Sequence, residues 1–483
     1  MKRLLLVCLV IAASLSLGAE SVDGLPGLAR FKLSNGLEVY AYRDASVPLV
    51  RVEMTFRSGA ISQSAESAGL FRLYERMLLR SSSARSGSSS VKAALASAGA
   101  AEWKGRVGTE LSEYWIKLPS AKLEEGIAFW AGVFVSPSLD ESCLEAEKEA
   151  AIDEIRAQAS DPDSVYEAGI AKRLFSKYPW SRDPAGSEKA VRGATLASLK
   201  AAVEPWLAPG NAALFVGGDV DPEEARAAAE AAFGSWAAKP DPWAKSIPSN
   251  PRLGVTRPTW LLFPDASMPE GKGRVDVRYR GPDIASDPAA SYAADLWSAL
   301  TAPQGGRFKA GLAASVPKLA AESIEASYVS QRDGGCISIS TYFDVDPASP
   351  AVERARAFKE RARGYEMTAM KADKSYFTDD DYVRARERIL GERAVAADTA
   401  DGMIGSLAFW WATASIAYYV GYPATLEKTG PNEISAFVDT YVMRNLEVVA
   451  LRMNPIDIEK EKKSFASSGF QTVDATNSFW WQK

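Results

Sequence analysis

The sequence predicts an α+β protein made of two homologous, duplicated domains, each a mixed β-sheet packed with helices. Two observations lead to this prediction. Segments that alternate like β-strands stand apart from longer segments with helical periodicity, which is typical of α+β domains. The pattern of the first half then returns in the second half, in units far longer than a solenoid repeat. Duplication of one whole domain explains this repetition.

Residues 1–19 have the features of a secretory signal peptide. The basic pair Lys2-Arg3 precedes an apolar run over residues 4–17, and Gly18-Ala19 supplies small residues for cleavage. The apolar run is short for a membrane span, and no later stretch is long and apolar enough to cross a bilayer. We therefore expect an exported protein, periplasmic or extracellular, with no membrane span.

The segments of the first half follow one another in order. Residues 29–33 and 37–41 alternate around Asn35-Gly36, a pair that favours a tight hairpin turn. Residues 50–56 alternate too, as a strand with one buried face. The remaining expectations are helices at 69–79, 91–98, 121–134 and 141–159, a Ser-rich loop at 81–90, strands at 114–118 and 211–216, and a helix capped by Asp221.

The second half repeats these segments. Residues 275–281 (VDVRYRG) echo residues 52–58 (VEMTFRS) at an offset of 223. Residues 434–455 follow the pattern of residues 199–220 at an offset of 235, each a helix that leads into a strand. Short loop insertions account for the change of offset.

A linker separates the two copies. Residues 237–256 contain four prolines and no apolar periodicity, which is typical of a connection between domains. We therefore expect an N-terminal domain over residues 20–236 and a C-terminal domain over residues 257–483. In the C-terminal domain, a charged helix at 380–392 takes the place of the helix at 141–159.

Composition excludes several classes of function. The formal net charge is −5, which argues against a nucleic-acid-binding surface. The chain contains no histidine, so it has no Ser-His-Asp triad, no Cys-His pair and no His-containing zinc site. The two cysteines beyond the signal, Cys143 and Cys336, are far apart in sequence and are expected to be separate thiols. A disulfide between them is the alternative.

The segment at residues 69–79 (GLFRLYERMLL) carries the main functional signal. Its apolar residues have the spacing of a helix core face, while Arg72, Glu75 and Arg76 share another face. With histidine at positions 72 and 76 it would read H-x-x-E-H, the inverted zinc motif, in which two imidazoles one turn apart bind the metal. Arginine has no lone pair to offer a metal, so we expect no zinc here.

The chain resembles the pitrilysin/insulinase-type (inverzincin) metallopeptidases, in particular the branch that includes mitochondrial processing peptidase and its bacterial relatives. The resemblance rests on the Asn-Gly hairpin, the strand that ends at residues 56–59 (FRSG), the helix at 69–79, and a later helix with Glu147 and Glu154 seven residues apart. It implies two duplicated domains that form half of a clamshell chamber for peptides. It also implies that Glu154 stands at the third zinc-ligand position and that Glu75 is the general base in active relatives.

The differences from the family fall on its chemistry. Arg72 and Arg76 replace both ligand histidines. The resemblance therefore implies a degenerate zinc site at Arg72, Glu75, Arg76 and Glu154, with no catalytic residue, no metal ligand and no cofactor.

The family's substrate-binding positions are not recognisable either. Its Gly-Gly-x-x-Asn region corresponds to residues 99–103, where the Asn is not evident. Its Arg/Tyr pair corresponds to Ser315 and Glu322, or in another register to Ala313 and Ala320. Substrate-binding residues are therefore left unassigned.

Two interpretations of the charged helix face remain. Removing a divalent cation from a site with two carboxylates would leave buried negative charge, which two guanidinium groups could neutralise by pairing with Glu75 and Glu154. Alternatively, Arg72, Glu75 and Arg76 form a solvated helix face with ion pairs one turn apart. The other matches to the family favour the first interpretation.

The leading functional hypothesis is a non-catalytic subunit. It would pair with a homologous, catalytic H-x-x-E-H peptidase, help to form the peptide chamber, and bind extended peptides along a sheet edge. A stand-alone exported peptide-binding or scaffold protein is the alternative. A carboxylate-dyad enzyme that uses the acidic run at residues 379–381 is disfavoured, because acids at a helix start suit the helix dipole. The C-terminal Trp480 and Trp481 are a weak signal for a docking tail.

Overall fold

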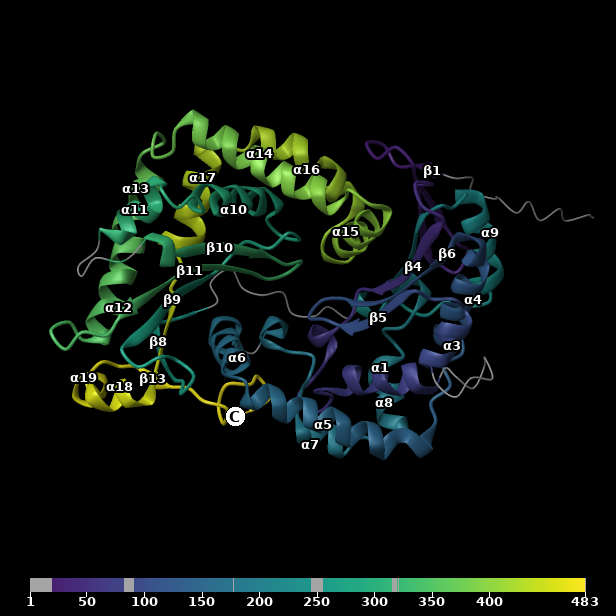
Figure 1. The fold of residues 1–483 in the computed structure, drawn as a ribbon, viewed down its shortest axis with the longest axis horizontal. Helices are drawn as coiled ribbons and strands as arrows, with labels where there is room; N and C mark the ends of the chain where they lie inside the picture. Colours follow the sequence, from purple (N-terminus) through teal and green to yellow (C-terminus); the bar gives the residue numbers. More distant parts are fainter. Residues whose placement is uncertain are drawn as a thin grey trace, which may run out of the picture.

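The computed structural model describes residues 20–81, 91–176, 178–244, 255–314, 319 and 321–482. Over these residues the chain forms two halves side by side, each with its own β-sheet and helices (Figure 1). The prediction of an α+β fold with two duplicated halves is confirmed. Outside the described residues lie the expected signal peptide (1–19), most of the Ser-rich loop (82–90), part of the expected linker (245–254), Ser315 and Ala320.

The first half contains a seven-stranded sheet in the order β1-β2-β3-β7-β4-β6-β5. β3 and β7 run parallel, and the other neighbours run antiparallel. The expected hairpin is present: Lys32 pairs with Glu38, and Gly36 in the turn has a φ of 96°. The strands are β1 (Glu20–Ser21), β2 (Leu28–Lys32), β3 (Glu38–Arg43), β4 (Leu49–Phe56), β5 (Glu102–Val107), β6 (Ser112–Pro119) and β7 (Ala212–Gly218).

The second half contains a six-stranded sheet in the order β10-β11-β9-β12-β8-β13. β12 and β13 each run parallel to β8, and the other neighbours run antiparallel. The strands are β8 (Thr259–Pro264), β9 (Lys272–Arg280), β10 (Glu325–Ser330), β11 (Gly335–Asp344), β12 (Val448–Met453) and β13 (Gln471–Thr472).

The two sheets share one topology. The series β5-β6-β4-β7-β3 in the first half corresponds to β10-β11-β9-β12-β8 in the second. The strand register agrees with the offsets seen in the sequence. Val52 pairs with Val216, and the residues 223 and 235 positions later, Val275 and Leu451, pair with each other. The duplication therefore extends to individual residue pairs in the central strands.

The helices pack around these sheets, with α4 and α9 on the outer face of the first sheet and α12 on the second (Figure 1). The first half has α1 (Leu70–Ser81), α3 (Val91–Ser97), α4 (Leu123–Phe134), α5 (Leu144–Ser160), α6 (Pro162–Phe175), α7 (Glu188–Arg192), α8 (Leu196–Val203) and α9 (Pro222–Phe233). The second half has α10 (Pro288–Thr301), α11 (Arg307–Ala313), α12 (Ala351–Glu360), α13 (Thr368–Ala372), α14 (Asp379–Ala396), α15 (Ala400–Thr413), α16 (Ile416–Lys428), α17 (Pro431–Val438), α18 (Pro455–Lys460) and α19 (Lys462–Ala466).

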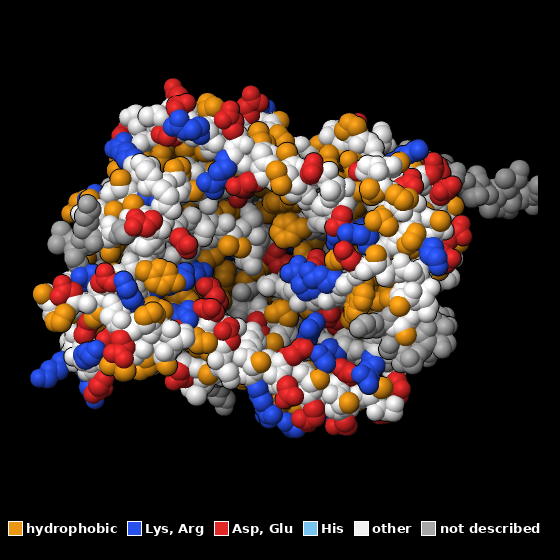
Figure 2. Space-filling view, in the orientation of Figure 1, with side chains coloured by type: hydrophobic (Ala, Val, Ile, Leu, Met, Phe, Trp, Pro, Cys, Tyr) orange, Lys and Arg blue, Asp and Glu red, His pale blue; other side chains and the backbone are white. Residues whose placement is uncertain are grey.

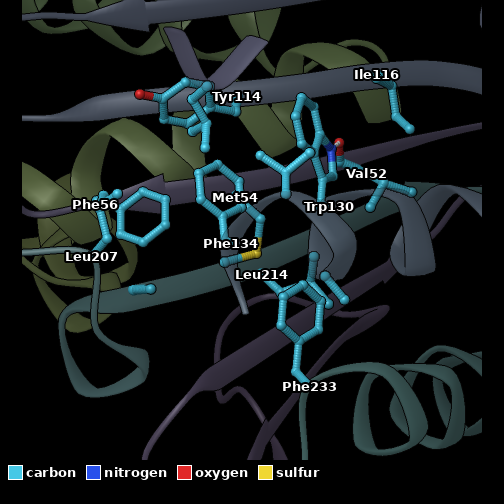
Figure 3. Close-up of a cluster of buried hydrophobic side chains, with 14 of the residues drawn as sticks. Val52, Met54, Phe56, Tyr114, Ile116, Trp130, Phe134, Leu207, Leu214 and Phe233 are labelled. Atoms are coloured by element: carbon cyan, nitrogen blue, oxygen red, sulfur yellow. Dashed lines mark hydrogen bonds between the residues drawn. The ribbon is translucent and has the colours of Figure 1, made fainter. Parts of the chain in front are cut away.

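The core of the first half lies between its sheet and α4 (Figure 3). Phe56 of β4 packs against Phe134 of α4 with ring centroids 4.9 Å apart. The Trp130 indole donates a hydrogen bond of 3.1 Å to the Val52 carbonyl oxygen, so its one polar atom is satisfied inside the core. These contacts fix the outer face of β4.

The inner face of β4 corrects one prediction. We expected residues 50–56 to bury one face, but both faces are buried. The polar face lies beneath α15, which comes from the other half of the chain. Gly217 of the neighbouring strand allows this approach, since an added Cβ would lie 2.2 Å from Cγ1 of Ile404 on α15. The polar residues of β4 are therefore covered by a helix from far along the chain, and the alternation of residues within the strand cannot predict such a contact.

A helix from the first half also packs on the sheet of the second half. α6, from the first half, packs on β8, β9 and β12. An added Cβ at Gly169 of α6 would lie 2.7 Å from the Phe263 ring, and the Tyr166 ring lies 4.7 Å from the same ring between centroids. α6 follows α5 as α15 follows α14. Helices in equivalent positions are thus exchanged between the halves.

Each exchanged helix closes a buried ion-pair network on a central strand. In the first half, the Arg51 guanidinium lies 2.6 Å from Glu53 on the same strand and 3.1 Å from Asp401 of α15. The Glu53 side chain is fully buried. Burial raises the pKa of Glu53, while the charge on Arg51 opposes this shift.

The second half has the matching network. Asp276, 223 positions after Glu53 and equally buried, lies 2.8 Å from the Arg278 guanidinium. The same Arg278 nitrogen lies 2.8 Å from Glu167 of α6. We call these two networks together the paired clasp. A buried carboxylate, an arginine two residues away and a carboxylate on the exchanged helix recur in both halves.

The apolar character of α15 and α16 follows from this position between the halves. Among the described residues, no single helix is long and apolar enough to cross a membrane, and only α15 and α16 taken together reach that length, with a bend of 97° between them.

Part of the expected linker is packed on the first half. The Trp243 indole donates a hydrogen bond of 3.0 Å to the Arg57 carbonyl oxygen and one of 3.0 Å to the Asn211 side chain. The expected boundaries, at residues 236 and 257, stay predictions.

Substitution of Asp276 tests the paired clasp. Asp276→Ala removes the buried partner of Arg278 and leaves it only the exposed Glu167 carboxylate. Breaking a buried pair costs about 3–5 kcal/mol of unfolding free energy. The exposed pair between Lys272 and Asp344 is the control, and Asp344→Ala should cost at most about 1 kcal/mol. Urea denaturation of both variants measures the difference. Equal midpoints would contradict a structural role for the clasp.

Glu110 supplies a pH-dependent contact between the halves. Its carboxylate accepts hydrogen bonds from the Arg332 backbone N–H, at 3.0 and 3.1 Å to the two oxygens, and from the Trp180 indole. Burial raises the pKa of Glu110 from 4.5 to about 7. A raised acid pKa means that ionisation destabilises the folded state as the pH rises from 4.5 to about 7.

The variant Glu110→Gln should remove the loss of folding stability that ionisation of Glu110 causes. Wild-type protein should lose stability relative to the variant across that window, by up to about 3 kcal/mol at pH 8. Denaturation midpoints of both proteins at pH 5 and pH 8 provide the measurement. Parallel pH profiles for the two proteins would show that Glu110 ionises normally in the folded state.

Candidate functional site

α1 carries three of the four expected site residues. Its core face holds Leu73, Tyr74, Met77 and Leu78, all fully buried, so the rotation of the helix is fixed by packing. The helix begins where Gly69 has a φ of 93° and an added Cβ would lie 2.4 Å from a backbone oxygen of a neighbouring loop. The charged face of α1 therefore points in a defined direction, towards α5.

α5 presents the partner carboxylates. Ala151 and Ile152 are buried on one side of the helix, and α5 lies against α1. Glu147 and Glu154 are seven residues apart and share the face that meets α1.

The structure brings Arg72, Glu75, Arg76 and Glu154 together. The Arg72 guanidinium lies 2.6 Å from Glu75 and 3.3 Å from Glu154. Arg76 lies 2.5 Å from Glu154 and 2.9 Å from Glu147. We call these four residues, together with Glu147, the arginine–carboxylate cluster. Each guanidinium bridges two carboxylates.

The burial of the cluster distinguishes between the two interpretations of the charged helix face, a cluster of paired charges and a solvated surface. Arg72 and Glu154 are partly exposed, with 33% and 40% of the side chain accessible. Glu75 is only 2% exposed and Glu147 only 8%. Burial raises the pKa of Glu75, and the charge on Arg72 opposes the shift. Two of the carboxylates are thus too buried for a solvated helix face.

The carboxylates in turn hold Arg72 in its charged form. Burial acts to lower the pKa of Arg72, but the Glu75 and Glu154 carboxylates outweigh it and the pKa is raised. Arg80 extends the cluster, 3.4 Å from Glu147. Three arginines and three glutamates then balance one another, so the cluster neutralises its own buried charge.

This set of residues does not fit zinc. Zinc needs donors with lone pairs, and the guanidinium groups at positions 72 and 76 have none. Among the residues that the structure describes, no group of three or more His, Cys, Asp or Glu side chains is arranged to hold a metal ion. The carboxylates that such a site would use are each engaged by arginine.

Glu147 is the cluster member that the sequence analysis did not assign. Its spacing of seven from Glu154 placed both on one helix face, which was the available signal. The spacing did not show that Glu147 would be buried against α1, because that depends on how the two helices meet.

The edge strand β5 passes beside the cluster. α1 and β5 are in contact, and an added Cβ at Gly105 would lie 3.1 Å from a Glu75 carboxylate oxygen. β5 stands at the end of its sheet, and its first three residues are exposed. The cluster therefore lies under a strand edge that is open to solvent.

The other expected positions are placed as follows. Residues 99–103 lead into β5, with Gly99 at a φ of 80°. Ala313 ends α11, and Glu322 lies in a short helical turn. The acidic run at 379–381 forms the first turn of α14, whose Thr378 side chain caps the helix.

The C-terminal tryptophans pack on the body of the protein. The Arg182 guanidinium lies 5.5 Å above the Trp480 ring, and the Trp481 ring stacks on Phe479 at 5.7 Å. Phe479 itself is buried. The weak signal for a docking tail is therefore wrong in this structure. Cys143 and Cys336 are free thiols, as expected.

Two family models of the peptidase family M16 match consecutive parts of the chain. The family described as insulinase (peptidase family M16) matches residues 39–186, and the peptidase M16 inactive domain matches residues 193–371. An uncharacterized zinc protease of Rickettsia felis is 21% identical over 204 residues, which is 42% of this chain and 49% of that protein. The chain therefore matches about half the length of this relative.

Solved structures show the same fold at low identity. A protease from Helicobacter pylori superposes with a TM-score of 0.72 at 15% identity, over 89% of this chain and 100% of that one. The periplasmic protease PqqL from Escherichia coli superposes with a TM-score of 0.68 at 15% identity, over 93% of this chain and 51% of that one. The present chain thus matches about one half of PqqL.

Proposed function

Because the chain belongs to the insulinase family of peptidases (M16), we propose that it is a catalytically inactive zinc-peptidase homologue. In this proposal it is the non-catalytic subunit that pairs with an active H-x-x-E-H peptidase and helps to form a peptide chamber. The protein would be exported, to the periplasm or the extracellular space. The signal-like residues 1–19 and the periplasmic neighbour PqqL support this location.

The arginine–carboxylate cluster carries the proposal of inactivity. The general base of active relatives has its counterpart in Glu75, which is buried and paired with Arg72. The position of the third ligand has its counterpart in Glu154, which is shared between Arg72 and Arg76. A carboxylate in this state neither binds a metal ion nor activates water bound to one. The cluster keeps α1 and α5 in register without zinc.

The match to half of PqqL supports the pairing. That protease is a single chain of about twice this length, and its first half has been solved separately. A chamber built from two such halves would pair this unit with a second one. A homologue with intact zinc ligands would supply both the second half and the hydrolysis.

The open edge of β5 supports peptide binding. An edge strand offers unpaired backbone N–H and C=O groups, to which an extended peptide can add as a further strand. This mode of binding needs no metal.

A stand-alone exported peptide-binding or scaffold protein is the second candidate. The missing Asn in residues 99–103 favours it, because the substrate-binding pattern of the active family is then altered as well as the zinc site. Peptide binding without a partner would distinguish this candidate.

Restoring the ligands tests whether the cluster replaces a zinc site. The double variant R72H/R76H presents two imidazoles one turn apart with Glu154 opposite, and we expect it to bind about one zinc ion per chain. Wild-type protein purified in parallel should contain far less than one. Elemental analysis after dialysis against zinc provides the measurement.

A third variant serves as the control. Adding E154Q to the double variant removes the third ligand and should weaken zinc binding at least about tenfold. Stoichiometric zinc in wild-type protein would refute the proposed inactivity. A folded double variant without zinc affinity would show that the cluster is not built on a zinc-site geometry.

Reconstitution tests the proposed pairing. The chain should form a stable complex with a homologous H-x-x-E-H peptidase from the same source, seen by size-exclusion chromatography with light scattering. Cleavage of an unstructured peptide should need both chains. If the peptidase is fully active alone and no complex forms, the subunit proposal fails.

A further inference from the structure

A second site lies in the other half of the molecule, away from the cluster. A pocket of about 530 Å³ opens between α10, α14, α15, α16 and the edge strand β10. Four aromatic side chains line it, together with one acid from α10: Tyr328, Phe409, Trp410, Tyr422 and Asp295. The function proposed above does not involve this pocket.

Asp295 has no cationic partner. Its carboxylate accepts one hydrogen bond of 2.7 Å, from the Tyr422 hydroxyl. Among the described residues, no Lys or Arg nitrogen lies within 4.0 Å of it. Burial raises the pKa of Asp295 to about 7, while the Tyr422 hydroxyl and the charge on Arg393 act against the shift. The pocket therefore holds an acid whose charge is only partly compensated.

Arg388 and Arg393 of α14 line the pocket as well, and each has contacts with other groups. The Arg393 guanidinium lies 4.1 Å above the Tyr419 ring and 4.8 Å above the Tyr422 ring, and it donates a hydrogen bond of 2.9 Å to the Tyr419 carbonyl oxygen. Arg388, one turn earlier, pairs with Glu392 at 3.1 Å. Neither guanidinium neutralises Asp295 directly, in contrast to the arginines of the paired clasp and of the cluster.

The aromatic wall is rigid and suited to a cation. The Trp410 ring stacks on Tyr418 with centroids 5.4 Å apart, and Tyr418 stacks on Tyr292 at 4.8 Å. Trp410 also lies 6.3 Å from Tyr422. Aromatic faces carry partial negative charge and attract ammonium and guanidinium groups. A cation in the pocket would meet both these rings and the Asp295 carboxylate.

The edge strand β10 borders the pocket and offers a backbone edge with which an extended peptide could pair. β10 stands at the end of its sheet, in the position equivalent to β5. Tyr328 and Ser330, which face one side of the strand, line the pocket together with the exposed Val329. Figure 2 shows the molecule hollowed between the two halves, with hydrophobic side chains inside the hollow and Lys or Arg side chains beside it. A chain lying along β10 could place a side chain in the pocket.

We propose that this pocket binds the cationic side chain of a basic residue in an extended peptide that lies along β10. The peptide as the source of the cation rests on the proposed function, whereas the cation site itself does not. An anion is disfavoured because Asp295 would repel it. A purely apolar side chain would leave the acid buried without a partner.

A small probe tests the site directly on the full-length protein. Isothermal titration should show that Nα-acetyl-arginine methylamide binds about tenfold more tightly than its neutral citrulline analogue. The variant D295N keeps an acceptor for the Tyr422 hydroxyl and should abolish this preference. The matched control D379N, at the exposed start of α14, should leave it unchanged. Equal affinities for the two probes in wild-type protein would overturn the proposal.

Wild-type protein offers a second readout that needs no variant. A bound cation favours the carboxylate, so the probe should release about half a proton at pH 7 and bind about tenfold more tightly at pH 8 than at pH 6. The other charged or titratable groups that face Asp295 are Arg388, Glu392, Arg393 and the surrounding tyrosines. Binding without proton release would count against Asp295 as the partner.

A peptide pair separates this inference from the proposed function. Two unstructured decapeptides should differ only in one arginine or citrulline, and the arginine form should bind more tightly. If both bind equally well, peptide binding stands and the pocket proposal fails. If the small probe binds but neither peptide does, the cation site stands and the peptide-chamber role fails.

Discussion

The paired clasp is the interaction on which the rest of the structure depends. Each sheet carries a fully buried carboxylate on its central strand, Glu53 in one half and Asp276 in the other. Neither sheet can bury that acid alone, because the covering helix comes from the other half. A buried carboxylate is tolerable only when a cation and hydrogen bonds compensate it. The exchange of α6 and α15 therefore ties the two halves into one body, and this fixes where their sheet edges lie.

The same rule of charge compensation explains the arginine–carboxylate cluster. α5 brings Glu147 and Glu154 against Glu75 of α1, which would place three carboxylates together. Arg72 and Arg76 offset this negative charge. Arginine is suited to this role because its fork can engage two carboxylates at once and it does not lose its proton. The cluster is therefore held together by ion pairs between arginine and carboxylate side chains.

The two sheet edges give the molecule its proposed binding surfaces. β5 passes beside the cluster, and β10, its equivalent, borders the pocket around Asp295. In both halves an acid thus lies near an open strand edge. The difference is that arginines satisfy the first acid, while the second has only the Tyr422 hydroxyl. The duplicated fold therefore offers one edge with a neutralised site and one edge with an acid that lacks a cation.

The sequence alone determined many strands and helices of the first half, the duplication and the absence of histidine, because alternation, helical spacing and residue counts are local or countable properties. It also placed Arg72, Glu75, Arg76 and Glu154 in one site through the family resemblance. It did not predict the edge strands β5 and β10 or the exchanged helices α6 and α15. Only the tertiary structure decided that both faces of β4 are buried, that Glu147 joins the cluster and that the C-terminal tryptophans pack on the protein body. The physical reason is the same in each case. Periodicity shows that a strand or helix has a polar face, but which distant element covers that face depends on contacts between residues far apart in the chain.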